Sequence, residues 1–232
     1  MIEATSIPVS ERNTIKRTQI YSKHGFGQAT KSEGSGVAYK GNVGNPYGSN
    51  IIRVSAESSK AYKYVAEFKT AGSDIWKVAI WNKFGPNGRL DGWFDHACTI
   101  FNLSSGQTQY VAFDDDSQGG WAAAPGESIS VDDAGGYAST WGEFDFGSFI
   151  NHGWSGFDVS AIAAQAGNLE VFGMKICDNI TQICSSITPN AAEVDNAYIF
   201  QNRFEDGIGG NLPPGPVELS VTLGYTGVES TT

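Results

Sequence analysis

The pattern of apolar and polar positions along the chain predicts strands rather than helices. Residues 61–69 alternate, with Tyr64 and Phe68 on the same side, as expected of a strand that buries one face. Residues 75–83 are almost continuously apolar, which is typical of a strand inside a core. Two further apolar runs within residues 98–114 are separated by Ser-Ser-Gly and predict a hairpin.

Two more strands are predicted over residues 169–177 and 217–225, and turn signals recur roughly every 8–14 residues, the spacing of a sandwich or barrel. Residues 158–167 fit either a short helix or a strand. Thr188 suits an N-cap and is followed by proline, so residues 189–203 predict a helix. The fold class predicted is mainly β: a two-sheet antiparallel β-sandwich with one short helix near residues 189–203.

The same pattern divides the chain into one domain and two tails. Residues 1–33 are polar and unpatterned, so we expect a flexible N-terminal tail or a propeptide. A propeptide would be cut at the dibasic pair Lys16-Arg17, which is equally consistent with a solvated pair of charges. Residues 34–226 are predicted to form a single β-sandwich domain, and residues 227–232 a disordered tail.

Composition supports an all-β domain and argues against nucleic acid and membranes as partners. The 232 residues include 29 Gly, 13 Phe, 9 Tyr and 6 Trp, and only 17% are charged, which does not suit disorder. The net charge of -10 and a pI near 4.7 disfavour nucleic acid and anionic membranes, since both attract a basic surface. We therefore expect no nucleic-acid or membrane partner, and a monomer.

The three cysteines and two glycosylation triplets indicate a secreted protein. Cys177 and Cys184 flank a six-residue loop and predict a hairpin disulfide, with two buried free thiols as the alternative. Cys98 is left over and is expected to be a small buried apolar side chain. Asn102 and Asn179 each begin an N-x-[ST] triplet and are candidate glycosylation sites.

Three acids between residues 142 and 162 could form a sugar site. Glu143 and Asp145 are two positions apart, so on a strand they share one face with Cα atoms about 6.5–7 Å apart. Asp158 could face them from a neighbouring strand. Paired carboxyl groups serve as proton donor and as base or nucleophile in glycoside hydrolysis. The alternative is a set of acids on a solvent-facing strand edge.

Aromatic side chains beside glycine are the other candidate for sugar binding. Trp93, Trp121 and Trp154 lie in turn-like stretches, where an exposed ring could stack on the apolar face of a sugar. The alternative is burial, the usual fate of tryptophan. Asp114 and Asp116 begin a D-x-D-x-Q-G spacing similar to a calcium loop, but its twelfth position is proline. We therefore count both as ligand-binding candidates rather than metal ligands.

The sequence predicts no metal and no cofactor. It contains no zinc-type C-x2-C pair, no G-x-S-x-G elbow and no G-x4-G-K-[ST] loop. His24-Gly25-Phe26 resembles the start of secreted copper monooxygenases that cut polysaccharides. Copper would require a free amine on His24, and 23 residues precede it.

Long glycine- and tryptophan-rich motifs occur in order along residues 34–225: YKGNVGNPYGSNI, VAFDDDSQGGWAAA, GGYASTWGEFDFG, GWSGFDVSAIAAQ, GMKIC and DGIGGNLPPGPV. In these motifs the chain resembles the family of secreted fungal proteins named for the allergen Asp f 4. The resemblance implies an extracellular fungal protein, an allergen homologue. It leaves the biochemical role to be argued from the residues.

A second, more distant resemblance covers residues 100–165. The stretch GEFDFG followed by GWSGFDVSAI is similar to thaumatin-like proteins, which are β-sandwiches with an acidic cleft that in some members binds or cuts β-1,3-glucans. The match implies that Glu143 and Asp158 are cleft acids. The next cleft aspartate of that family falls on Ala163, and its cleft arginine and dense disulfides have no counterpart here.

These features together predict a secreted, cell-wall-associated protein that binds cell-wall polysaccharide, with β-glucan favoured, in an acidic and aromatic groove. Trp154 and Trp121 would stack on sugar, while Glu143, Asp145 and Asp158 would accept hydrogen bonds from hydroxyl groups. One alternative is an endo-β-glucanase with Glu143 as proton donor and Asp158 as its partner. Another is a non-catalytic surface or host-interaction protein without a glycan site.

Overall fold

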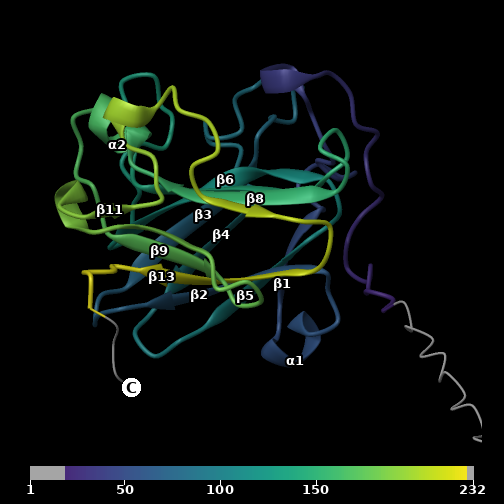
Figure 1. Ribbon diagram of the computed structural model, residues 1–232, viewed down its shortest axis with the longest axis horizontal. Helices are drawn as coiled ribbons and strands as arrows, with labels where there is room; N and C mark the ends of the chain where they lie inside the picture. The colour runs from purple at the N-terminus through teal and green to yellow at the C-terminus, as the bar shows by residue number, and fades with distance from the viewer. Residues whose placement is uncertain (1–18, 229–232) are drawn as a thin grey trace, which may run out of the picture.

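The described part of the chain, residues 19–228 of a computed structural model, forms two stacked β-sheets (Figure 1). The seven-stranded sheet has the order β1-β5-β2-β13-β9-β10-β11. Its strands are β1 (Ile51–Val54), β2 (Tyr64–Thr70), β5 (Gln109–Phe113), β9 (Met174–Asp178), β10 (Cys184–Ile187), β11 (Val194–Asp195) and β13 (Val217–Leu223).

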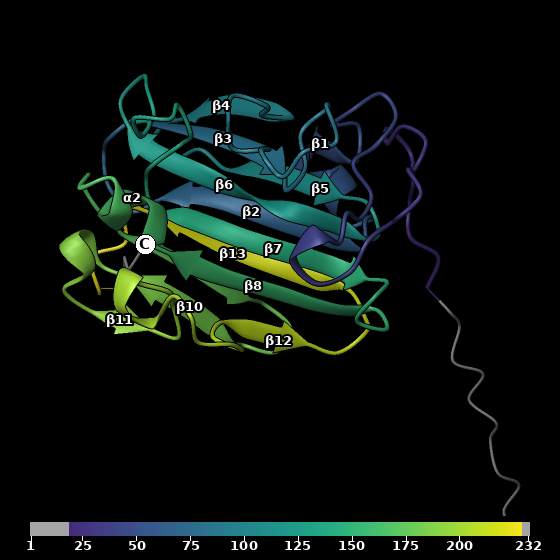
Figure 2. The same ribbon diagram turned by 90° about the horizontal axis from the view of Figure 1, so that it is seen from above.

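The six-stranded sheet has the order β12-β8-β7-β6-β3-β4. Its strands are β3 (Trp76–Asn82), β4 (Thr99–Leu103), β6 (Ser117–Pro125), β7 (Trp141–Ser148), β8 (Trp154–Ser160) and β12 (Gly210–Leu212). Short helical turns connect the strands: η1 (Gly36–Ala38), α1 (Ala56–Ser59), α2 (Ile162–Ala166), η2 (Pro189–Ala191) and η3 (Phe200–Asn202). Figure 2 shows that strands of the two sheets run in similar directions, as in an aligned sandwich.

The predicted mainly β fold with two sheets is confirmed, with one difference in strand direction. Strand β13 pairs in parallel with β2, whereas the other strand pairs between residues 19 and 228 are antiparallel. Because β2 and β13 are far apart in sequence, a long connection joins them, which a parallel pair requires. No helix in this part of the chain is long and apolar enough to cross a bilayer.

The core lies between the sheets and is dominated by aromatic rings. Phe68 of β2 meets Trp121 of β6 edge to face, with ring centroids 5.2 Å apart. Phe113 of β5 lies 4.7 Å from Phe144 of β7 by the same measure. Such pairs contribute about 0.5–1.5 kcal/mol beyond the area they bury. Because successive side chains of a strand point to opposite faces, every second residue of the six-stranded sheet points away from this core.

The helix predicted over residues 189–203 is wrong. The segment contains the 3-10 turns η2 and η3 with the short strand β11 between them. Asn190, Ala191 and Asn196 have φ of 58°, 54° and 48°, which interrupts any right-handed helix. The segment contains no glycine, but asparagine adopts left-handed backbone conformations more readily than most residues. Pairing of β11 with β10 then holds the segment at the sheet edge.

The predicted disulfide is confirmed. Cys177 and Cys184 are directly opposite each other on β9 and β10 and are joined by a bond with a Cα–Cα distance of 4.1 Å. Cys98 is a free thiol packed against the core, as predicted. Burial raises the pKa of Cys98 to about 11, so the thiol is protonated at neutral pH.

Residues that we expected in the N-terminal tail contact the sandwich in the structure. The backbone N–H of Ser22 donates to the carbonyl oxygen of Ala61 at 2.7 Å, and Gln28 forms a bridge with Asn45. This segment runs along the end of the sandwich away from α2 (Figures 1 and 2). The dibasic pair Lys16-Arg17 and the predicted C-terminal tail from residue 229 lie outside the described residues.

Candidate functional site: an acidic groove on the six-stranded sheet

A groove of about 460 Å³ lies on the side of the six-stranded sheet that faces away from the core. Strands β6, β7 and β8 form its floor, and Tyr198, Ile208 and Asn211 from the chain around β12 line one wall. Gly120 and Gly156 are on the floor. A Cβ added to Gly156 would meet only a carbonyl oxygen at 3.7 Å, so the missing side chain leaves open space in the groove.

The three predicted acids meet on this floor. In β7 the inward positions Phe144 and Phe146 are buried, so Glu143 and Asp145 point outward by alternation. The β7–β8 register places Glu143 directly opposite Asp158. Side chains opposite each other on neighbouring strands have Cβ atoms about 4.5–5.5 Å apart. The structure therefore brings Glu143 and Asp158 into direct proximity, with Asp145 one step along the same face.

Burial and mutual repulsion favour the protonated forms of the Glu143–Asp158 pair. Burial raises the pKa of Asp158 well above its ordinary value, and the Glu143 carboxylate raises it further. Burial also raises the pKa of Glu143, while the Ser160 hydroxyl and the Lys83 ammonium act in the opposite direction. Asp158 Oδ1 is buried and has no hydrogen-bond partner within the described residues. The pair is thus arranged to hold one proton between two carboxyl groups.

The rest of the floor is also polar and incompletely paired. Burial raises the pKa of Asp145, the Gln118 and Ser148 side chains lower it in part, and the nearby Asp116 raises it further. Asp145 Oδ1 and Gln118 Oε1 are buried without hydrogen-bond partners among residues 19–228. Lys83 is the only cationic side chain among the described residues that line the groove. Burial lowers the pKa of Lys83, although Asp145 and Glu143 favour its charged form.

Three tryptophans close one end of the groove. Trp141 lies beside Trp81 and Trp93, with ring centroids 5.1 Å and 5.9 Å away. Trp93, which was predicted as a ligand-binding residue, lines this groove with its side chain half-buried, and its contact with a ligand stays a prediction. Trp81 and Trp141 were not predicted as site residues. Alternation could have identified Trp141, because it is two positions from Glu143 on the same strand.

The predicted site residue Trp154 lies at the opposite end, where β8 begins. Its side chain is 47% exposed and lines a second hollow together with His152. This hollow shares Asp145, Gly156 and Asn211 with the main groove, so the two hollows adjoin each other on the same sheet. Trp154 is therefore placed to contact a ligand that extends along β7 and β8 beyond the acids.

Trp121 does not line the groove, and its prediction as a ligand-binding residue is wrong. Its side chain is 0% exposed and belongs to the core between the sheets. Room for the indole ring comes from a glycine on the neighbouring strand β7. A Cβ added to Gly142, the cross-strand neighbour of Trp121, would lie 2.2 Å from a ring atom.

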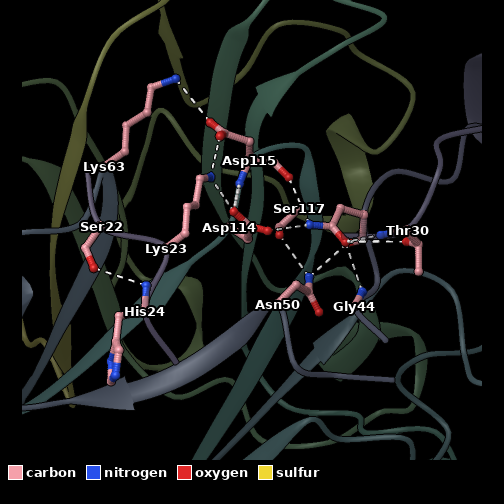
Figure 3. A network of polar contacts seen from close by, with 11 residues as sticks. Ser22, Lys23, His24, Thr30, Gly44, Asn50, Lys63, Asp114, Asp115 and Ser117 are labelled. Carbon is pink, nitrogen blue, oxygen red and sulfur yellow. Dashed lines mark hydrogen bonds and ion pairs between the residues drawn. The ribbon is translucent and has the colours of Figure 1, made fainter. Parts of the chain in front are cut away.

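Asp114 and Asp116, which were also predicted as ligand-binding residues, lie outside the groove and are engaged in contacts within the protein. Asp114 pairs with Lys23 and accepts a hydrogen bond from Asn42 Nδ2 at 3.0 Å. In Figure 3, Lys23 extends between Asp114 and Asp115. These carboxylates bind the N-terminal segment to the sandwich, and their oxygens are occupied within the protein.

Asp116 has a comparable structural role. Its carboxylate accepts hydrogen bonds from Tyr39 Oη and from the backbone N–H of Phe149, both at 2.9 Å, and from the Ser32 hydroxyl. It thereby joins the N-terminal segment to the turn between β7 and β8. Between residues 19 and 228, no cluster of three or more His, Cys, Asp or Glu side chains is arranged to hold a metal ion.

The two candidate glycosylation asparagines are both accessible. Asn102 is exposed on β4, and Asn179 is exposed in the hairpin turn closed by the disulfide. The Ser220 hydroxyl donates to Asn179 Oδ1 at 2.7 Å. Modification of either side chain remains a prediction.

The fold and this site define a class of protein: a two-sheet β-sandwich with an acidic, tryptophan-lined groove and an adjoining hollow that carries a further tryptophan. A family model, the Allergen Asp f 4-like domain, matches residues 49–223. The chain belongs to this allergen family, which confirms the first resemblance. It is 51% identical over 205 residues to Allergen Asp f 4 of Aspergillus fumigatus, covering 88% of this chain and 64% of that protein.

The chain thus spans about 64% of the length of this relative. Among solved structures, the protein elicitor MoHrip2 from Magnaporthe oryzae is similar with a TM-score of 0.41 and 14% identity. That match covers 70% of this chain and 99% of the elicitor. The thaumatin-like resemblance stays a prediction.

Proposed function

We propose that this protein is secreted and binds a fungal cell-wall polysaccharide, with β-glucan as the favoured ligand, in the groove on the six-stranded sheet. The observation that carries the proposal is the acidic groove lined by Trp93 and Trp141, together with the adjoining hollow that Trp154 lines beyond the acids. Aromatic rings stack on the apolar faces of sugars, and carboxyl groups take their hydroxyl hydrogen bonds.

Several features support the proposed location. The disulfide between Cys177 and Cys184 suits an oxidising compartment, and both candidate glycosylation sites are exposed. The relative in Aspergillus fumigatus is named as an allergen. We propose that the protein acts outside the cell or at the cell wall.

Co-sedimentation with insoluble β-1,3-glucan tests the proposal, with chitin and cellulose in parallel. Gly156→Leu should abolish depletion, because the new side chain fills the floor of the groove without a backbone clash. Gly72→Leu is the matched control, since Gly72 is exposed and a Cβ there meets nothing within 4 Å. Binding to no polysaccharide, or equal binding by both variants, would reject the groove as a glycan site.

Aromatic stacking has its own test. Trp154→Ala should weaken binding far more than Glu143→Gln, because the ring contributes contact area while a glutamine still accepts a hydrogen bond. Binding isotherms for the two variants and the wild type would show the ranking. Equal and negligible effects would remove Trp154 from the binding site.

A second candidate function is endo-β-glucan hydrolysis, favoured specifically by the adjacency and raised pKa values of Glu143 and Asp158. Glu143 would be the proton donor and Asp158 its partner. Retaining glycosidases hold their two carboxyl groups about 5–5.5 Å apart, with the scissile bond between them. Glu143 and Asp158 are opposite each other on neighbouring strands, a spacing close to that range, so hydrolysis is kept as the second candidate. Reducing-end release that Glu143→Gln abolishes without loss of binding would establish hydrolysis instead.

A further inference from the structure

The charge of the groove does not match a purely neutral ligand. Glu143, Asp145 and Asp158 lie on one floor, and Lys83 is the only cationic lining residue within the described chain. The whole chain carries a net charge of -10, so no general excess of positive charge offsets this local imbalance. A cation between the acids would relieve the repulsion that their packing creates.

The hydrogen-bonding capacity of the floor points the same way. Asp158 Oδ1, Asp145 Oδ1 and Gln118 Oε1 are buried acceptors without partners in the described structure. Buried polar atoms in proteins are almost always paired, so an arrangement of unpaired acceptors beside a groove calls for a donor from outside. Hydrogen bonds from a charged donor to carboxylates are about twice as strong as those between neutral groups.

The surrounding rings indicate what carries that charged donor. Trp93 and Trp141 lie at one end of the acids and Trp154 at the other, which suits pyranose rings in a chain. A bare metal ion would make no contact with these tryptophan rings, and residues 19–228 contain no suitable cluster of metal ligands. The ligand that satisfies both requirements is a sugar chain bearing ammonium groups.

We propose that the groove accepts 2-amino sugars in their protonated form, and prefers an oligosaccharide of glucosamine to the corresponding neutral glycans. This inference rests on the proposed function, since it names the saccharide class for the same groove. A protonated amine between Glu143 and Asp158 donates hydrogen bonds to both carboxylates, including the unpaired Asp158 Oδ1. The neighbouring sugar rings then reach the tryptophans at either end.

The proposal requires binding to depend on pH. The Ser160 hydroxyl and the Lys83 ammonium act on Glu143, which in turn acts on Asp158. Asp145 acts on Lys83, Asp116 acts on Asp145, and Tyr198 lies within reach of both acids and of Asp206. Affinity should rise with pH as the acids ionise, because their protons compete with the ammonium group. It should fall again when the sugar amine loses its own proton. Added salt should weaken the preference for the charged sugar.

Isothermal titration with three β-1,4-linked oligomers of equal length isolates the group at carbon 2. Oligomers of glucosamine, N-acetylglucosamine and glucose carry an amine, an acetamide and a hydroxyl there, on the same backbone. The glucosamine oligomer should bind at least about tenfold more tightly than the other two at a pH where the amine is protonated. A β-1,3-gluco-oligosaccharide of the same length reports on the proposed function itself.

Variants assign the preference to the groove. Asp158→Asn and Asp145→Asn should each reduce the preference severalfold, and two independent variants guard against a folding defect in one of them. Glu57→Gln removes an exposed acid on α1, away from the groove, and should leave the preference unchanged. Gly156→Leu should abolish binding of the charged and neutral oligomers alike.

The possible results separate the two proposals. Binding of the neutral oligomers with no preference for glucosamine overturns this inference and leaves the proposed function standing. Binding of no oligomer overturns both. A preference that survives in Gly156→Leu, or an equal affinity for a lysine oligomer, would mean general attraction of cations to an acidic surface and would overturn the inference.

Discussion

Replacing Asp158 by asparagine should stabilise the protein at neutral and alkaline pH. Once the pair has lost its shared proton, two unit charges about 5 Å apart, the separation expected of opposite side chains on neighbouring strands, repel by about 3 kcal/mol at an effective dielectric constant of 20. Because the groove is open to water on one side, the expected gain in the free energy of unfolding is about 1–3 kcal/mol at pH 8. The asparagine amide can also donate to Glu143.

The pH dependence follows from the direction of the pKa shifts. The folded-state pKa of each acid is raised, so between the unfolded and folded pKa values the folded protein binds more protons than the unfolded chain. The free energy of unfolding therefore falls as pH rises through that window. Asp158→Asn removes one of these groups and lowers the pKa of Glu143, which should make the fall smaller.

Chemical denaturation followed by tryptophan fluorescence at pH 4, 6 and 8 measures both effects. The quantity of interest is the difference between the variant and the wild type, because it cancels the contributions of other acids. Glu57→Gln serves as the control and should track the wild type within about 0.5 kcal/mol. The reasoning is refuted if Asp158→Asn is less stable than the wild type at pH 8. It is also refuted if the free energy of unfolding falls as steeply with pH in the variant as in the wild type.

Three further predictions follow from the core, the disulfide and the N-terminal contacts. Trp121→Ala should lower the free energy of unfolding by about 3–5 kcal/mol, because the ring is buried in the core, whereas the partly exposed Trp154→Ala should lower it by less than about 0.5 kcal/mol. Chemical denaturation measures both values, and equal losses would contradict the assigned positions. Replacing Cys177 and Cys184 by serine should lower the free energy of unfolding by about 2–3 kcal/mol, because the disulfide restricts the unfolded chain. Thermal unfolding would show this as a lower Tm, and an unchanged Tm would contradict it. Asp116→Ala should cost about 2 kcal/mol or more and increase proteolysis of the N-terminal segment, because buried donors lose their acceptor; unchanged proteolysis would show that other contacts suffice.

Much of the fold was accessible from the sequence because strand alternation and turn chemistry are local. The apolar run over residues 75–83 became β3, and the alternation over residues 61–69 marks the inward face of β2. Cys177 and Cys184 close a hairpin short enough for the sequence separation to predict the pairing. The family resemblance was also recoverable, since its motifs extend along most of the chain.

The helix expected over residues 189–203 shows where local signals fail. Thr188 and Pro189 are a favourable start, but the backbone reverses at asparagines and the segment pairs with the edge of β10. A helix of this length gains little by itself, so contacts with the rest of the protein decide its conformation. Those contacts are not visible in a local window.

Asp114, Asp116 and Trp121 were misplaced for a related reason. Each stands in a stretch rich in glycine or acid that resembles an exposed turn. In the structure Trp121 fills space left by Gly142 on the neighbouring strand, and the two acids bind an N-terminal segment more than 70 residues away. Only packing between distant parts of the chain distinguishes such buried roles from exposed ones.

The sequence by itself therefore predicted strands at β2, β3, β4, β5, β9 and β13, the disulfide and the family. It placed Glu143 and Asp145 on one face on the condition that their segment is a strand. The tertiary structure alone decided that Glu143 stands opposite Asp158, that Trp141 and Trp154 border the acids, and that Gly156 leaves the floor open. The physical reason is register. Alternation assigns a side chain to a face, but its cross-strand neighbour depends on pairing between strands, which the energy of the whole core selects.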